Sequence, residues 1–161
     1  MRRWIAALAL LPATAPLPPA PARADGCGDV GRRIAEATGA TIVRRTVGSD
    51  VYVHFSHPDA LDFALQCRSP NPRKGPGVFV SYAGAAPPPA YFALAATAAA
   101  ATLDLKPPVI RAAAQRCAAA ARRDPEESAT VETKVLRVEC TVNKASGSAT
   151  LMIASALMRP F

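Results

Sequence analysis

Residues 87–123 read PPPAYFALAATAAAATLDLKPPVIRAAAQRCAAAARR, and this stretch decides the fold. It holds two alanine-rich segments, each of which begins with prolines. A first helical turn tolerates proline because the N–H that proline lacks has no intrahelical partner there. Alanine has the highest helix propensity, and apolar residues recur at spacings of three and four, so the sequence predicts two helices. Asp104, Lys106 and the prolines interrupt any apolar run of about 20 residues, which argues against a membrane span.

The segments on either side of these helices alternate as strands do. Before the helices, the pattern predicts an antiparallel meander of four strands, at residues 41–47, 51–55, 61–67 and 77–82. The third of these runs also allows a short helix, but its strict alternation favours a strand. After the helices, the apolar residues of the segment 130–142 shift from odd-numbered to even-numbered positions at Val135 and Leu136. We interpret this segment as one long strand with a β-bulge. Residues 151–157 then return as the second strand of a C-terminal hairpin.

A short N-terminal helix is predicted at residues 29–38, with Asp29 as its cap and Gly39 as its stop. The whole order is one helix, four strands, two helices and two strands. This order is typical of an α+β protein, in which an antiparallel sheet packs against the two alanine-rich helices. The length suits one domain with a single core.

The start of the chain has the pattern of an export signal. A pair of arginines precedes a short apolar segment at residues 4–11, and a small-x-small cleavage pattern ends at Ala24. We therefore expect residues 1–24 to be a cleaved signal peptide and residues 25–161 to form a single disulfide-stabilised domain, periplasmic or secreted. An uncleaved anchor is the alternative, but the apolar segment is short for a bilayer span.

The charge of the mature chain is modest. Cleavage removes three arginines and no acidic residue, which lowers the formal net charge from +7 to +4. The arginine pairs that remain are scattered and have few aromatic residues among them. The sequence therefore predicts neither nucleic-acid binding nor adsorption to a membrane.

Four cysteines remain after cleavage: Cys27, Cys67, Cys117 and Cys140. An even number of cysteines in an exported chain predicts two disulfides, and four cysteines allow three connectivities. We expect Cys27–Cys67 and Cys117–Cys140, because each of these pairs would tie a helix to a strand. Neighbouring cysteines are too far apart for the C-x-x-C spacing of zinc and redox sites.

The candidate metal ligands are His54 and His57, the two histidines of the chain. Two histidines without a nearby third ligand make a weak metal site, so a surface histidine and a turn histidine are the simpler interpretation. A hydrolase would need a nucleophile, a base and an orienting group, and no G-x-S-x-G motif is present. The carboxylate pairs Asp59/Asp62 and Glu126/Glu127 are more simply turn residues. We therefore predict no cofactor and, as the main hypothesis, no catalytic activity.

The remaining candidate is a contact surface. Residues 68–76 form a basic, proline-rich loop that carries Arg73 and Lys74, and Tyr82 belongs to a group of aromatic residues near it in the sequence. Such a loop beside exposed aromatics suits another envelope protein or an anionic polymer. The sequence thus favours a small exported binding module. The alternative is a small periplasmic hydrolase or metal-binding protein that uses His54 and His57.

Overall fold

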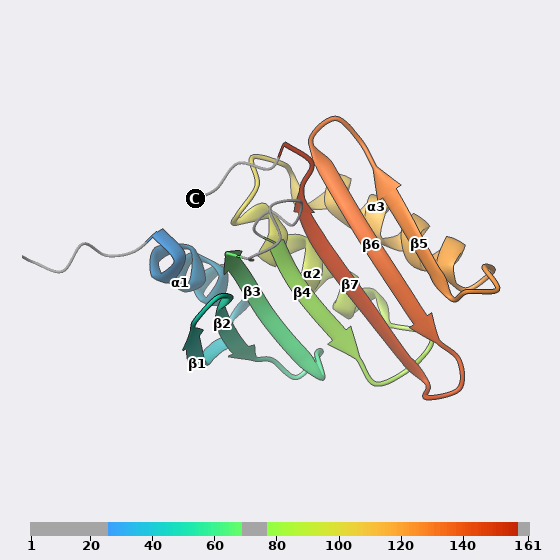
Figure 1. Ribbon diagram of the computed structural model, residues 1–161, viewed down its shortest axis with the longest axis horizontal. Coiled ribbons are helices and arrows are strands. Elements are labelled where there is room, and N and C mark those ends of the chain that lie inside the picture. Colours follow the sequence, from blue (N-terminus) through green and yellow to red (C-terminus); the bar gives the residue numbers. More distant parts are fainter. Residues whose placement is uncertain (1–25, 69–76, 158–161) are drawn as a thin grey trace, which may run out of the picture.

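The structure is a computed structural model that describes residues 26–68 and 77–157. The predicted signal peptide and the predicted contact residues Arg73 and Lys74 lie outside the described residues. The elements in chain order are α1 (Gly26–Thr38), β1 (Thr41–Val47), β2 (Val51–Ser56), β3 (Asp62–Arg68), β4 (Gly77–Tyr82), α2 (Pro89–Ala100), α3 (Pro107–Ala121), β5 (Ser128–Glu132), β6 (Leu136–Asn143) and β7 (Ser148–Ser155) (Figure 1).

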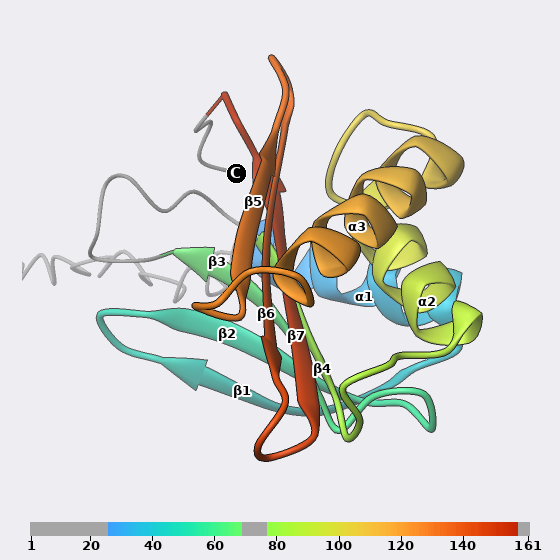
Figure 2. The same ribbon diagram turned by 90° about the vertical axis from the view of Figure 1, so that its right-hand side faces the viewer.

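The strands form one antiparallel sheet in the order β1-β2-β3-β4-β7-β6-β5. The described helices lie together on one face of this sheet, as Figure 2 shows with the sheet nearly edge-on. The predicted α+β class is therefore confirmed, and the two alanine-rich helices pack against the sheet as expected. The N-terminal meander and the C-terminal strands join into one sheet because β4 pairs with β7.

The predicted long strand at residues 130–142 is wrong. The chain turns at residues 133–135, so that β5 and β6 pair as a hairpin and the sheet has seven strands. The Thr133 hydroxyl oxygen accepts the N–H of Leu136 at 3.0 Å, and the Thr133 N–H donates to the Leu136 carbonyl at 2.8 Å. The change of parity at Val135 and Leu136 therefore marks a turn and not a bulge.

Replacing Thr133 with alanine tests this turn. We expect Thr133→Ala to lower the free energy of unfolding by about 1 kcal/mol, because the N–H of Leu136 loses its side-chain acceptor. Urea denaturation measures the loss. Thr130→Ala, at an exposed position of β5 with no such bond, is the matched control, and equal losses in both variants would contradict the assigned role.

The core lies between the sheet and the helices. Helix α2 is central in the helical layer and contacts α1, α3, β4 and β7. Tyr91, Ala95, Ala98 and Ala99 of α2 are fully buried. Small side chains on this helix let its neighbours approach closely, which explains why an alanine-rich sequence sits at the centre of the protein.

Both predicted disulfides are present in the structure. Cys27 of α1 is bonded to Cys67 of β3, and Cys117 of α3 is bonded to Cys140 of β6. Each bond ties a helix to the sheet, and the two bonds hold opposite ends of the helical layer. Gly39, the predicted stop of α1, has a φ of 73°, which favours glycine.

None of the helices in the described ranges is both long and apolar enough to cross a bilayer.

Candidate binding surface

One face of the sheet carries no helix of the described chain; we call it the uncovered face (Figures 1 and 2). Side chains alternate between the two faces of a strand, so cross-strand partners share a face. The register places a central row across this face, and its members are Arg44, His54, Ala64, Phe79, Met152, Glu139 and Thr130. Phe79 and Met152 are half-buried cross-strand partners in the middle of this row. The row is thus apolar in the middle and charged towards both ends.

A polar cluster lies at the β1–β2 end of the uncovered face. Gln66 is 4% exposed, and its Nε2 donates to the Tyr52 hydroxyl at 3.0 Å and to Asp50 Oδ1 at 3.3 Å. Desolvation raises the pKa of Tyr52 above its ordinary value; the charge of Asp50 adds to this effect, and the hydrogen bond from Gln66 opposes it. The hydrogen bonds of Gln66 tie β3 to β2 and to the β1–β2 turn, so the cluster supports this end of the surface.

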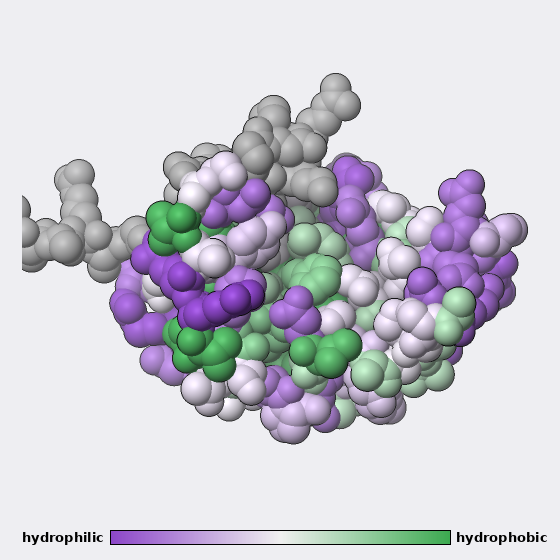
Figure 3. Space-filling model, turned by 60° about the horizontal axis from the view of Figure 1, so that its bottom comes forward, coloured by the Kyte–Doolittle hydropathy of each residue, from purple (hydrophilic) through white to green (hydrophobic). Residues whose placement is uncertain are grey.

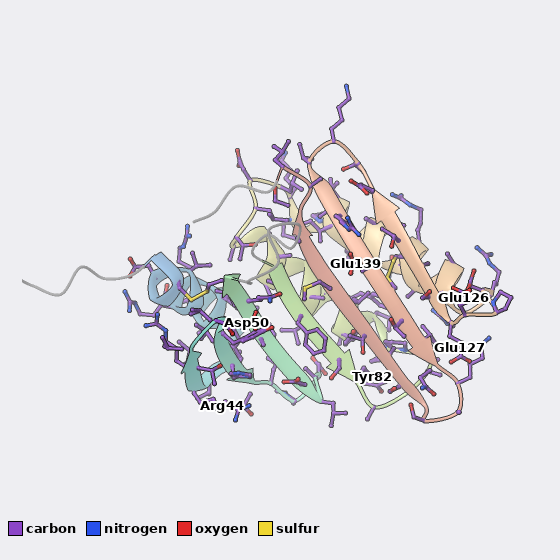
Figure 4. All side chains as sticks on the ribbon, viewed as in Figure 1. Arg44, Asp50, Tyr82, Glu126, Glu127 and Glu139 are labelled. Carbon is purple, nitrogen blue, oxygen red and sulfur yellow. A yellow bond between two sulfur atoms is a disulfide. The ribbon has the colours of Figure 1, made fainter. Side chains whose placement is uncertain are left out.

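The other end of the face carries an ion pair on β6. Arg137 Nη2 lies 2.7 Å from Glu139 Oε1, and both side chains are more than a third exposed. Such a pair contributes little to stability, because solvent screens it. Figure 4 shows Arg44 and Asp50 near β1 and β2, and Glu139 on β6, on the other side of β4 and β7. Charged groups thus lie on both sides of the apolar middle.

The two histidines have different surroundings. His54 lies on the uncovered face, where its Nε2 is 3.2 Å from the Thr46 hydroxyl and its ring is 5.8 Å from that of Tyr52. His57 follows β2, and its Nδ1 accepts the N–H of Asp59 at 3.1 Å, which closes a local turn. Within the described residues, no group of three or more His, Cys, Asp or Glu side chains is placed to hold a metal.

His57 borders a shallow hollow of about 240 Å³ beside the helical layer. Its other lining residues include Thr38 of α1, Asp59, and Ala93, Leu94 and Thr97 of α2. Asp59 Oδ2 is 3.9 Å from His57 Nδ1, too far for a hydrogen bond. Among the described hydrogen bonds, no serine hydroxyl contacts either histidine. Within the described residues, the hydrogen bonds of the two histidines thus involve the Thr46 hydroxyl and the N–H of Asp59.

Of the carboxylates that could suggest glycosidase chemistry, Glu127 makes contacts within a turn. Glu127 accepts the N–H of Lys144 at 3.0 Å through its side chain, and its carbonyl accepts the N–H of Val142 at 2.8 Å. Asp124 accepts the N–H of Glu126 at 2.8 Å. Figure 4 shows Glu126 and Glu127 at the margin of the sheet, in the connection from α3 to β5. The Glu127 carboxylate therefore binds the β6–β7 turn, whereas Glu126 contributes its backbone N–H to a local turn.

Tyr82 lies away from the apolar middle of the uncovered face. Its register partner is Ala149, which is buried on the side of the helices, and its ring lies 5.6 Å from that of Tyr91. A Cβ placed on Gly84 would come within 2.6 Å of the Tyr82 ring. The ring is therefore packed against its own loop and α2. The apolar side chains in the middle of the uncovered face are instead Phe79 and Met152, which the sequence did not single out.

Strand β1 was not singled out from the sequence either. All seven of its residues are exposed, including Ile42 (41%), Val43 (57%) and Val47 (74%). The signal that could have identified it is a β-branched run interrupted by two adjacent arginines, because charge on a strand is typical of a sheet edge. Strongly hydrophobic and strongly hydrophilic groups lie side by side at this end of the molecule (Figure 3).

The fold and this surface define the class of the chain, a small α+β protein held by two disulfides. Comparison with known proteins gave no match among family models, curated proteins or solved structures.

Proposed function

We propose that this chain is a non-catalytic binding protein that acts outside the cytoplasm. The observation that carries the proposal is the uncovered face of the sheet, with Phe79 and Met152 in its middle and charged side chains on both sides. Apolar side chains inside a charged rim are typical of contact surfaces. In the sequence, the predicted basic loop with Arg73 and Lys74 connects β3 to β4, two of the strands that form this face, and its charge would suit an anionic partner.

Two features support the location. The two disulfides stabilise the fold where thiols are oxidised, and such bonds are rare in the cytosol. The signal pattern that ends at Ala24 predicts export before the disulfides form.

Expression of the full chain in a bacterial host, followed by fractionation and intact-mass measurement, tests both the export and the disulfides. We expect an extracytoplasmic product that starts at Asp25 and lacks four hydrogen atoms through disulfide formation. A cytoplasmic, reduced product that retains residues 1–24 would overturn the location.

Partner capture from an envelope extract tests the surface. We expect Phe79→Thr with Met152→Thr to weaken capture, because threonine keeps strand propensity but removes the apolar contact. We expect Arg73→Glu with Lys74→Glu to weaken it too, and to lower the salt concentration at which the protein leaves a heparin column.

The matched control is Arg122→Glu with Arg123→Glu at the end of α3, which changes charge equally on exposed residues elsewhere. Equal capture by the wild type and all three double variants would remove the proposal. Circular dichroism of each variant should match that of the wild type, which checks that the fold is kept.

A further inference from the structure

The middle strand, β4, divides the uncovered face into two matching halves. Strands β3, β2 and β1 lie on one side of β4, and strands β7, β6 and β5 lie on the other. Phe79 of β4 is central in its row, with Ala64 of β3 and Met152 of β7 as its cross-strand neighbours. A rotation of 180° about an axis along β4 would therefore place β3 over β7, β2 over β6 and β1 over β5 of a second copy.

Charged side chains on the outer strands are opposite in sign on the two sides of β4. In the central row, Arg44 lies on β1 and Glu139 lies on β6, across the face from each other (Figure 4). At one end of the strands, Asp50 belongs to the β1–β2 turn and Lys134 to the β5–β6 turn. Arg45 belongs by its register to the side of the helices, so it takes no part in this pattern.

A face with this charge pattern complements itself in one orientation. After rotation about β4, Arg44 of each copy lies beside Glu132 and Glu139 of the other, and Asp50 lies near Lys134. An axis across the strands would instead place Arg44 near Arg44 and Glu139 near Glu139, which like-charge repulsion opposes. A partner of a single charge sign, such as an anionic polymer, would meet repulsion on one side of β4. The pattern therefore favours a second copy on this face.

We propose that two copies of this chain form a face-to-face dimer through their uncovered faces, with the two-fold axis along β4. The register would set four kinds of pair opposite each other: Phe79–Phe79, Ala64–Met152, His54–Glu139 and Tyr52–Arg137. The last pair places a guanidinium over an aromatic ring, which is a favourable contact. This inference rests on the proposed binding function and names a second copy as the partner of the apolar middle.

The size of the face suits such a dimer. Its seven strands, about 4.8 Å apart and about 20 Å long, present roughly 600 Å² per copy. Two faces would bury about 1,200 Å² in total, which is at the lower end for specific interfaces. Sheets pack face to face with their strands within about 30° of each other. We therefore expect a reversible dimer of micromolar affinity.

Sedimentation equilibrium of the purified, oxidised protein measures the dissociation constant of the dimer. Phe79→Thr should raise this constant about a hundredfold, because it removes both rings at the centre of the interface. Arg44→Glu and Glu139→Arg should each raise it at least about tenfold, because each dimer then contains the repulsive contact twice. Arg111→Glu, on the exposed side of α3, is the charge-matched control and should leave it unchanged.

An equimolar mixture of the Arg44→Glu and Glu139→Arg variants tests the orientation. In a mixed dimer, the glutamate introduced in one copy lies beside the arginine introduced in the other, and the second contact is that of the wild type. We therefore expect the mixture to dimerise with a dissociation constant within about threefold of the wild-type value. Such recovery also shows that both variants are folded.

Three results would each overturn the inference: a wild type that stays monomeric up to about 1 mM, a dimer unaffected by Phe79→Thr, and a mixture that dimerises no better than its components. If the wild type is monomeric while Phe79→Thr with Met152→Thr still weakens partner capture, the second copy is wrong and the proposed function stands. Equal capture by the wild type and every double variant removes the proposed function itself.

Discussion

Removing the Cys117–Cys140 disulfide by replacing both cysteines with alanine is expected to lower the free energy of unfolding by about 4 kcal/mol. The bond closes a sequence separation of 23 residues, and its loss returns about 3 kcal/mol of chain entropy to the unfolded state. Both cysteines are also buried, Cys117 completely, so the missing sulfur atoms leave about 1 kcal/mol of unfilled packing. Urea denaturation at neutral pH measures the sum.

The Cys27–Cys67 bond provides the internal comparison. Its separation of 40 residues gives a slightly larger entropic effect, but Cys67 is only half-buried, so its removal disturbs less packing. We therefore expect the two double variants to lose similar amounts. Reductant should lower the free energy of unfolding of the wild type by more than that of either variant, because each variant has one bond fewer to lose. A chelator should not change the free energy of unfolding. A loss below about 1 kcal/mol in both variants would show that the bonds add little to the fold.

These magnitudes bear on where the protein can work. A domain of this size has a total stability of about 5–15 kcal/mol, so two bonds of this strength account for a large part of it. In a compartment that keeps thiols reduced, the same chain would have little stability left. The disulfide prediction therefore also tests the physical basis of the proposed extracytoplasmic role.

The fold was predictable where local chemistry and tertiary packing agree. Proline and alanine define α2 and α3, and the alternation of Val51, Val53 and Phe55 defines the inward face of β2. The turn at residues 133–135 could not be predicted, because it contains none of the glycine, asparagine or proline residues that usually mark a turn. Its closure depends on the Thr133 hydroxyl, and the same change of parity suits a bulge equally well.

The binding surface was less predictable than the fold. Exposure of β1 depends on its place at the end of the strand order, which long-range pairing decides and local sequence does not. The sequence does not assign Phe79 to a face, because Val78, Phe79 and Val80 are all apolar and show no alternation. Its place opposite Met152 on the uncovered face follows from the pairing of β4 with β7, which joins segments that are far apart in the chain.

Tyr91 is the side chain whose loss should damage the core most. It is fully buried in α2, its hydroxyl donates to the Val80 carbonyl at 2.7 Å, and its ring lies beside those of Tyr82 and Phe92. We expect Tyr91→Ala to cost about 4 kcal/mol through the cavity that it leaves. Tyr91→Phe keeps the ring and should cost about 1 to 2 kcal/mol at neutral pH, because the Val80 carbonyl loses a donor.

The hydroxyl of Tyr91 also makes stability depend on alkaline pH. Burial raises its pKa above the ordinary value of 10.0, and a backbone hydrogen bond from Leu151 opposes this only in part. Above pH 10, the unfolded state releases the tyrosine proton while the folded state retains it. The contribution of the Tyr91 hydroxyl to the free energy of unfolding is therefore complete below pH 10, and it declines by up to about 1.4 kcal/mol per pH unit above it. Tyr91→Phe lacks this proton but keeps Tyr52, so the comparison isolates Tyr91. The excess of the wild type in free energy of unfolding over this variant should vanish about one to two pH units above 10. Urea denaturation of both proteins between pH 8 and pH 11 measures this difference; a difference that stays constant over that range would show that the folded state admits the ionised hydroxyl.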